Sequence, residues 1–167
     1  GWEGKPSSNW FPWLKGKLEG RGVIVDVPAM PNTEHPKESE WVAHLSKIVG
    51  EPSEDTFLIG HSLGGITILR YLESLPEREE IGGVVLVAAF SEQLPNQKAF
   101  AELSSFFSRT VDFEKVRRSV LRQIVAIQSD NDPYVPLKHG KIFEEKLGAK
   151  HISIPNGGHL NAGDGFK

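Results

Sequence analysis

The chain has 167 residues, enough for one domain with its own hydrophobic core. A hydrophobic content of 38% and a charged content of 25% are typical of an ordinary globular protein, and a net charge of −3 gives no basic field for nucleic acid or anionic membranes. The absence of cysteine excludes disulfides, thiolate catalysis and zinc–thiolate sites. We find no apolar run near the ~18 residues that span a bilayer and no signal-peptide pattern, so we expect a cytoplasmic protein.

In chain order, predicted helices alternate with predicted strands. The first helix covers about residues 9–19, with an apolar face formed by Trp10, Trp13, Leu14 and Leu18. The later elements are a strand at 23–27, a helix at 36–49, a strand at 56–59, a helix at 66–75, strands at 84–89 and 124–127, a helix at 137–147 and a strand at 151–154. Apolar strands separated by helices predict an α/β fold with a mostly parallel sheet and helices on both faces.

Residues 91–119 interrupt this alternation, because they are longer than a usual connection between a strand and a helix. They are rich in apolar side chains, among them Phe100, Phe106, Phe107 and Phe113. Two interpretations stay open: a crossover helix with a long entry loop, or a small cap over the strand ends with an aromatic wall.

The pattern is cut short at both ends of the chain. Gly1–Gly4 is typical of a loop that leaves a strand, and residues 163–167 lie where a final helix would begin. We therefore expect residues 1–167 to form a single domain that lacks an N-terminal strand and a C-terminal helix, with a gap or an edge in the sheet.

The chemistry centres on the Gly-x-Ser-x-Gly pattern at residues 60–64, between an apolar strand and a helix. This context predicts a nucleophile elbow with Ser62 at its strained tip. We expect Gly60 and Gly64 to lack side chains because Cβ atoms there would collide as strand and helix close up. The alternative is a glycine-rich turn with an exposed serine.

A serine nucleophile needs a base and an acid that orients it, in the chain order serine, acid, histidine for this kind of elbow. His159 follows the last strand, and Asp130 and Asp132 both follow the strand before it. Asp132 is the predicted acid because Pro133 restrains its backbone toward an extended shape. Asp130 is better interpreted as a turn former.

The oxyanion hole should use the backbone N–H of Leu63, next to the nucleophile, and a second N–H from the loop Gly1–Glu3, for which Trp2 is the candidate. His61 is expected to pack beneath the elbow or to hydrogen-bond locally. The remaining histidines have no ligand spacing and are interpreted as surface or structural residues: His35, His44, His139 and His151. We therefore predict neither a metal nor a cofactor.

Several segments together resemble the retinoblastoma-binding-protein-9-like group of small α/β-hydrolases over essentially the whole chain. They are GWEG with NWFPWL near the start, GHSLGG at 60–65, SDNDPYVP at 129–136 and NGGHLNAGDGF at 156–166. The resemblance implies a three-layer α/β-hydrolase sheet and a triad of Ser62, Asp132 and His159. Members of this group usually have a strand ending in His-Gly before the tryptophan, and this chain opens on Gly1.

The predicted function is that of a serine hydrolase acting on a small or medium carboxylic ester, with an amide or a thioester as alternatives, through an acyl-enzyme. The partner is then a small-molecule acyl substrate, with no nucleic acid and no membrane. The competing hypothesis is a protein-interaction module on a hydrolase fold with little turnover, whose protein partner the sequence does not identify.

Overall fold

The computed structural model of the chain describes residues 1–94 and 101–164. Their strands form one four-stranded sheet in the order β1-β2-β3-β4, and every neighbouring pair is parallel. The strands are β1 (Phe57–His61), β2 (Ile81–Val87), β3 (Val120–Ser129) and β4 (Lys150–Ile154). Parallel neighbours place all four carboxyl ends at the same edge of the sheet, where sites in α/β folds collect.

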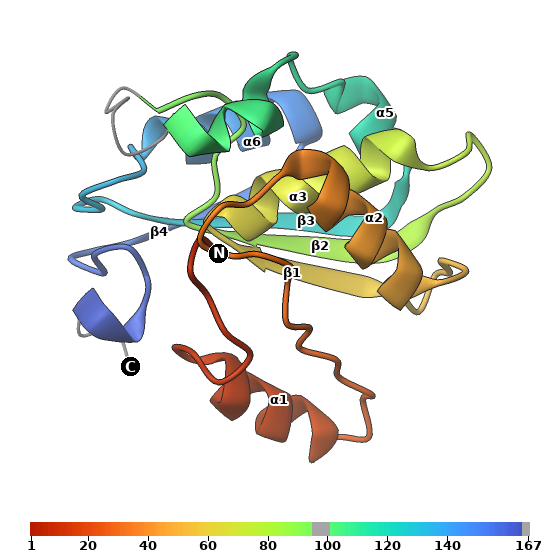
Figure 1. The fold of residues 1–167 in the computed structure, drawn as a ribbon, viewed down its shortest axis with the longest axis horizontal. Helices are drawn as coiled ribbons and strands as arrows, with labels where there is room; N and C mark the ends of the chain where they lie inside the picture. The colour runs from red at the N-terminus through yellow and green to blue at the C-terminus, as the bar shows by residue number, and fades with distance from the viewer. Residues whose placement is uncertain (95–100, 165–167) are drawn as a thin grey trace.

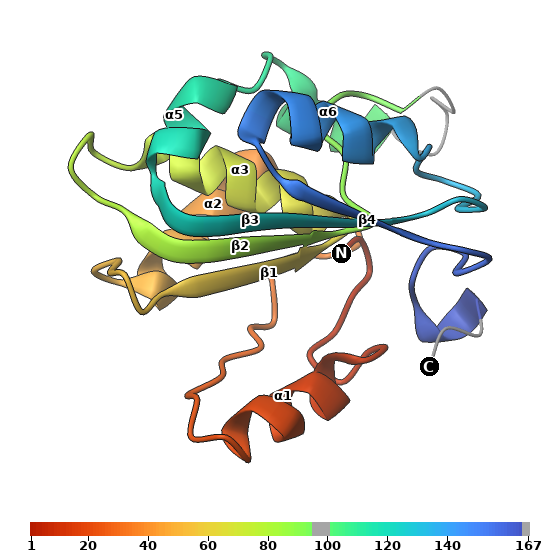
Figure 2. The same ribbon diagram turned by 180° about the vertical axis from the view of Figure 1, so that it is seen from behind.

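Helices lie on both sides of this sheet, as the sequence predicts. Figures 1 and 2 show α2 (Glu38–Val49), α3 (Leu63–Ser74), α5 (Phe113–Arg118) and α6 (Lys138–Leu147) on one side and α1 (Phe11–Glu19) on the other. Two short 3-10 helices, η1 (Ala101–Phe107) and η2 (Ala162–Asp164), complete the regular structure of the described residues.

The main core lies between the sheet and α2, α3, α5 and α6. Helix α3 is buried along most of its length, because it packs between the sheet and α2. Leu63, Ile66 and Leu72 are each at most 1% exposed. Each such aliphatic side chain contributes about 1.5–3 kcal/mol relative to an exposed one, so this packing holds the elbow helix rigidly against the strands.

The opposite side of the sheet is less well packed, and one strand predicted from the sequence does not form there. Helix α1 contains no fully buried residue. Of its predicted apolar face, Trp10, Leu14 and Leu18 are half-buried, and Trp13 is 64% exposed. Residues 23–27 form no strand, and Ile24 is 99% exposed. The physical reason is the lack of a partner: in the described sheet β1 is an edge strand, and no strand lies between it and residues 23–27 to supply a ladder of hydrogen bonds.

Of the long segment 91–119, residues 95–100 lie outside the described part of the chain, including Phe100. In the described part, Leu103 and Phe106 are buried in the main core, and Phe106 packs edge-on against Trp41 with ring centroids 5.7 Å apart. Phe107 stacks on Phe90 at 5.4 Å. Phe106 is therefore part of the main core, and Phe107 packs against it.

Candidate active site

The Gly-x-Ser-x-Gly segment forms the turn between β1 and α3. Ser62 has φ 54° and ψ −122°, a left-handed conformation that is costly for a residue with a side chain. The turn persists because its neighbours fix it: the Ser62 amide donates to the Val87 carbonyl at 2.8 Å, and α3 begins at Leu63. The strain sits at the residue predicted to be the nucleophile.

The glycines around Ser62 differ in what they allow. A Cβ on Gly60 would lie 2.6 Å from the Gly64 carbonyl oxygen, so close packing of strand and helix requires this glycine. The same expectation for Gly64 is wrong, because a Cβ there would meet nothing within 4 Å. Gly65 is the second glycine that packing requires, since its Cβ would overlap that of Ala89.

The structure brings the three predicted site residues into one hydrogen-bonded chain. His159 Nε2 lies 2.9 Å from Ser62 Oγ, and His159 Nδ1 lies 2.8 Å from Asp132 Oδ2. They come from the ends of β1, β3 and β4, which meet at one edge of the sheet. Because the carboxylate can only accept, Nδ1 carries the proton and Nε2 is free to accept one from Ser62.

The carboxylate of Asp132 is held by its own turn. Its side chain is 0% exposed, and its Oδ1 accepts the backbone amides of Tyr134 at 2.8 Å and Val135 at 2.9 Å. The other oxygen is left for His159. The turn at Asp132 and Pro133 thus fixes the direction in which the Asp132 carboxylate points.

A second set of contacts connects this turn to the loop that carries His159. Three consecutive backbone amides are held by side chains of the segment just before Asp132. The Asn156 amide donates to Asp130 Oδ1 at 2.8 Å, the Gly157 amide to Ser129 Oγ at 2.9 Å, and the Gly158 amide to Asn131 Oδ1 at 2.8 Å. Asp130 therefore anchors the histidine loop and does more than form a turn.

Sequence reasoning missed the contribution of Ser129 and Asn131 to this anchor. The signal was present as a run of short polar side chains directly after a buried strand. Such a run is typical of turns in general, so the sequence alone does not indicate a particular partner. The structure shows that these side chains accept hydrogen bonds from the loop after β4.

Of the two predicted oxyanion donors, Leu63 follows the nucleophile in the chain, and Trp2 follows Gly1, which packs against the elbow. Leu63 is the first residue of α3, where backbone amides have no partner within the helix. Gly1 packs against the elbow: a Cβ on it would be 3.4 Å from Ser62 Cβ. The loop that carries Trp2 therefore passes next to Ser62, and the Trp2 indole is fixed by donating to the Glu34 carbonyl at 3.0 Å.

His61 is buried next to the elbow, and its hydrogen bond is not the local one that the sequence analysis offers, because its partner is 98 residues away in the chain. Its Nε2 lies 2.8 Å from the carbonyl oxygen of His159. Burial is the main cause that lowers the pKa of His61 to about 4, so the ring is neutral at neutral pH. His139, also fully buried, has its pKa lowered to about 4, mainly by burial.

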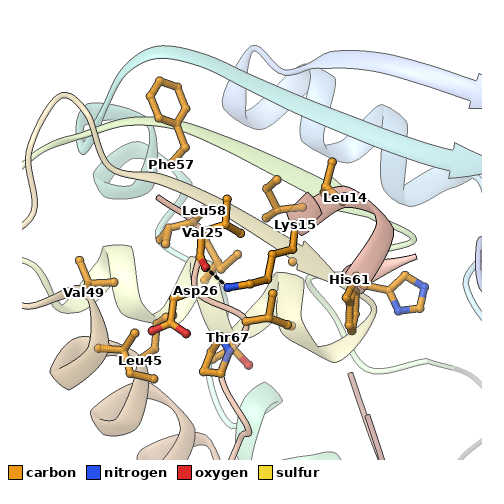
Figure 3. A pocket seen from close by; sticks show the side chains of 18 of the residues that line it. Leu14, Lys15, Val25, Asp26, Leu45, Val49, Phe57, Leu58, His61 and Thr67 are labelled. Atoms are coloured by element: carbon orange, nitrogen blue, oxygen red, sulfur yellow. Dashed lines mark hydrogen bonds between the residues drawn. The ribbon is translucent and has the colours of Figure 1, made fainter. Parts of the chain in front are cut away.

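A cavity of about 410 Å³ lies along the edge of β1, next to the elbow. Its walls come from α1, residues 23–28, α2, α3 and β1, and it reaches from Phe57 to His61 (Figure 3). Lys15 crosses it and donates to the Val25 carbonyl at 2.6 Å. Ser62 is not among the lining residues, so the cavity lies beside the hydroxyl and does not contain it.

Two further observations concern the described part of the chain as a whole. It contains no group of three or more histidine, aspartate or glutamate side chains arranged to hold a metal ion. None of its helices combines the length and the apolar character that crossing a bilayer requires.

The parallel sheet, the strained elbow and the three aligned side chains define the class of α/β hydrolases. The solved structure of the ydeN gene product from Bacillus subtilis superimposes with a TM-score of 0.92 at 34% identity, covering 99% of this chain and 87% of that one. MGS-M2, an α/β hydrolase from a deep-sea metagenome library, shares the fold with a TM-score of 0.55 at 17% identity, over 76% of this chain and 66% of its own.

The chain belongs to the serine hydrolase family, whose model matches residues 1–167. Among curated proteins, YdeN of Bacillus subtilis (strain 168) is 34% identical over 99% of this chain and 85% of its own length. The serine hydrolase RBBP9 of Rattus norvegicus is 28% identical over 90% of this chain and 77% of its own length. The family resemblance predicted from the sequence is confirmed.

Proposed function

We propose that this protein hydrolyses a small or medium carboxylic ester through a covalent acyl-enzyme on Ser62, with Asp132 and His159 completing a catalytic triad. The observation that carries the proposal is the hydrogen-bonded chain from Asp132 Oδ2 through both ring nitrogens of His159 to Ser62 Oγ. Both distances lie within the 2.6–3.2 Å or so that proton transfer requires.

The acylation step follows from the protonation states of these three groups: His159 carries a proton on Nδ1, and its Nε2 is free to accept one. His159 Nε2 accepts the Ser62 proton as Oγ attacks the ester carbonyl, and Asp132 stabilises the imidazolium that forms. The tetrahedral intermediate collapses when the imidazolium protonates the leaving alkoxide, which releases the alcohol. Water then attacks the acyl-enzyme, again with His159 as the base, and the carboxylic acid leaves.

The negative oxygen of the intermediate needs donors that are already in place. We assign the Leu63 amide, at the positive end of α3, and the Trp2 amide to this role. The supporting observations are the position of Leu63 at the start of α3 and the close approach of Gly1 to Ser62.

A fluorophosphonate probe tests the proposal directly, because it labels a serine only when the serine is activated. We expect labelling of the wild-type protein and hydrolysis of p-nitrophenyl esters, with a chain-length series defining the acyl preference. Ser62→Ala should abolish labelling and lower kcat by up to ~10⁶-fold, while its circular dichroism spectrum stays that of the wild type.

The interaction-module hypothesis predicts the opposite result. A wild-type protein that neither reacts with the probe nor hydrolyses any ester of the series would refute the proposed function. Product analysis with competing alcohols separates hydrolysis from acyl transfer on the same nucleophile.

A further inference from the structure

His61 lies at the end of β1, directly before Ser62, and is only 6% exposed. Its Nε2 is 2.8 Å from the His159 carbonyl oxygen. A carbonyl can only accept, so Nε2 of His61 carries a proton and donates it. The side chain of His61, which ends the strand before Ser62, therefore binds the backbone carbonyl of His159.

The rings add a second contact between the same two residues. The centroids of His61 and His159 are 4.9 Å apart, with the planes tilted by 59°. On its other sides His61 meets the edges of Trp10 and Phe11, at 6.1 and 6.4 Å. Aromatic rings thus contact His61 on several sides and favour the orientation in which it reaches the carbonyl.

Trp10 extends this arrangement to the next residue of the histidine loop. Its indole Nε1 donates to the Leu160 carbonyl at 2.9 Å. Leu160 has φ 50°, which is strained for a residue with a Cβ, and it is fully buried. Two consecutive carbonyls, those of His159 and Leu160, are therefore held by side chains in mutual contact.

We propose that His61 is a positioning residue for the catalytic base: its Nε2–H bond to the His159 carbonyl fixes the distance from His159 Nε2 to Ser62 Oγ. The inference rests on the proposed function. A shift of about 1 Å in such a group can cost on the order of 100-fold in rate, so a carbonyl that moves without its donor would slow the proton transfer.

Burial keeps His61 in the neutral state that this role needs, and it is the largest cause that lowers the pKa of the ring to about 4. The hydrogen bond to the His159 carbonyl and the carboxylate of Asp132 raise this pKa, whereas the imidazole of His159 and the amino group of Gly1 lower it. The His61 ring stays neutral over the pH range in which a serine hydrolase works, so His61 itself should add no ionisation to the rate profile near neutral pH.

Two substitutions at position 61 separate the hydrogen bond from the ring. His61→Gln keeps an N–H donor at the reach of Nε2, whereas His61→Phe keeps an aromatic ring and removes the donor. We expect His61→Phe to lower kcat on an activated ester, and the rate of fluorophosphonate labelling, by about 10- to 100-fold with little change in KM. His61→Gln should stay within about threefold of the wild type.

His139→Phe is the matched control, because His139 is also buried and, among the described residues, neither of its ring nitrogens has a hydrogen-bond partner. It should leave kcat unchanged. If His61→Phe retains wild-type kcat, or if the Gln and Phe variants lose kcat equally, the inference is wrong. Should His61→Phe fail to fold, ¹⁵N NMR of the wild-type protein decides: a His61 ring protonated on Nδ1 alone would also overturn it.

The same experiment separates this inference from the proposed function. Loss of probe labelling in Ser62→Ala tests the nucleophile, with His61 unchanged. If the probe labels the wild-type protein and the His61→Phe variant equally fast, His61 is not a positioning residue, and the proposed function is unaffected.

Discussion

The two carboxylate oxygens of Asp132 have different partners. Oδ1 accepts two backbone amides of its own turn, and Oδ2 faces His159 Nδ1. Asp130, two residues earlier, also anchors the histidine loop, through the Asn156 amide. The two aspartates therefore differ in what an amide substitution would disturb.

Asp132→Asn should lower kcat by roughly 10⁴-fold, because an amide NH₂ facing Nδ1 favours the imidazole tautomer that cannot accept the serine proton. Asp130→Asn should cost little, since Asn keeps the oxygen that accepts the Asn156 amide. The measurement is kcat for both variants on one activated ester, with circular dichroism to check folding. If Asp130→Asn loses most of its kcat while Asp132→Asn keeps a kcat near that of the wild type, the acid of the triad is Asp130.

At the scale of the secondary structure elements, the elbow depends on how closely β1, β2 and α3 approach one another. Gly65 lies in the first turn of α3, where a Cβ would overlap that of Ala89, just beyond β2. Gly64, the last glycine of the motif, faces open space instead. Packing thus requires Gly65, which the motif does not specify, as well as Gly60, which it does.

Gly65→Ala should lower the free energy of unfolding by about 1–3 kcal/mol, because the added methyl group overpacks a filled contact. Gly64→Ala should be neutral or stabilising by up to about 1 kcal/mol, since alanine favours a helix more than glycine does. Urea unfolding of the two variants makes the comparison. Equal destabilisation by both substitutions would contradict the packing argument.

At the scale of the whole molecule, α2, α3, α5 and α6 cover one side of the sheet, and the other, more open side carries α1 (Figure 2). A cavity lies along the edge of β1. Phe57 and Ile59 of β1 are 57% and 41% exposed on the open side. Within residues 1–94 and 101–164 no strand pairs with the outer edge of β1, which is a ready template for another strand. Gly1 lines the same cavity, and burial lowers the pKa of its amino group to about 6.

The expectation of an additional strand beside β1 stays a prediction, and an extension of the chain tests it. An apolar, β-branched segment of about five residues fused before Gly1 should raise Tm by several degrees, because it pairs with the β1 edge and replaces the buried amino group by an amide. An extension of equal length made of glycine and serine is the control. Equal Tm values for the two extended chains would show that the cavity does not accept a strand.

Two buried histidines make the stability of the whole fold depend on pH. His61 and His139 both have a folded-state pKa of about 4, below the ordinary value of 6.5, mainly because burial disfavours the charged ring. The neighbours Glu92 and Lys138 act on His139 in opposite directions. The unfolded chain therefore binds more protons than the folded chain between these two pKa values.

Stability should be constant with respect to these groups above pH 6.5 and should fall as the pH drops from 6.5 toward 4. For His61 alone the loss is on the order of 3 kcal/mol, a large part of a typical total of about 5–15 kcal/mol. Thermal unfolding from pH 8 to pH 4 measures it. His61→Gln and His139→Phe should each flatten the acid side of the profile, and unchanged slopes in both would contradict this assignment.

The sequence by itself determined the elements whose signals are local. Short apolar runs predicted the strands β1 to β4, and the context of Gly60 to Gly64 predicted a strained turn at Ser62. The order serine, acid, histidine led to Asp132 and His159, which the structure places within hydrogen-bond distance of their expected partners. The strand predictions succeeded because each strand signal depends on a few neighbouring residues.

Tertiary structure decided what depends on partners far away in the chain. Residues 23–27 have the composition of a strand yet form none, because a strand exists only with a neighbour to complete its ladder. Ser129 and Asn131 have the composition of a turn, and only the tertiary structure shows that they bind the loop after β4. His61 and the His159 carbonyl are 98 residues apart, so only the closed fold shows that one holds the other.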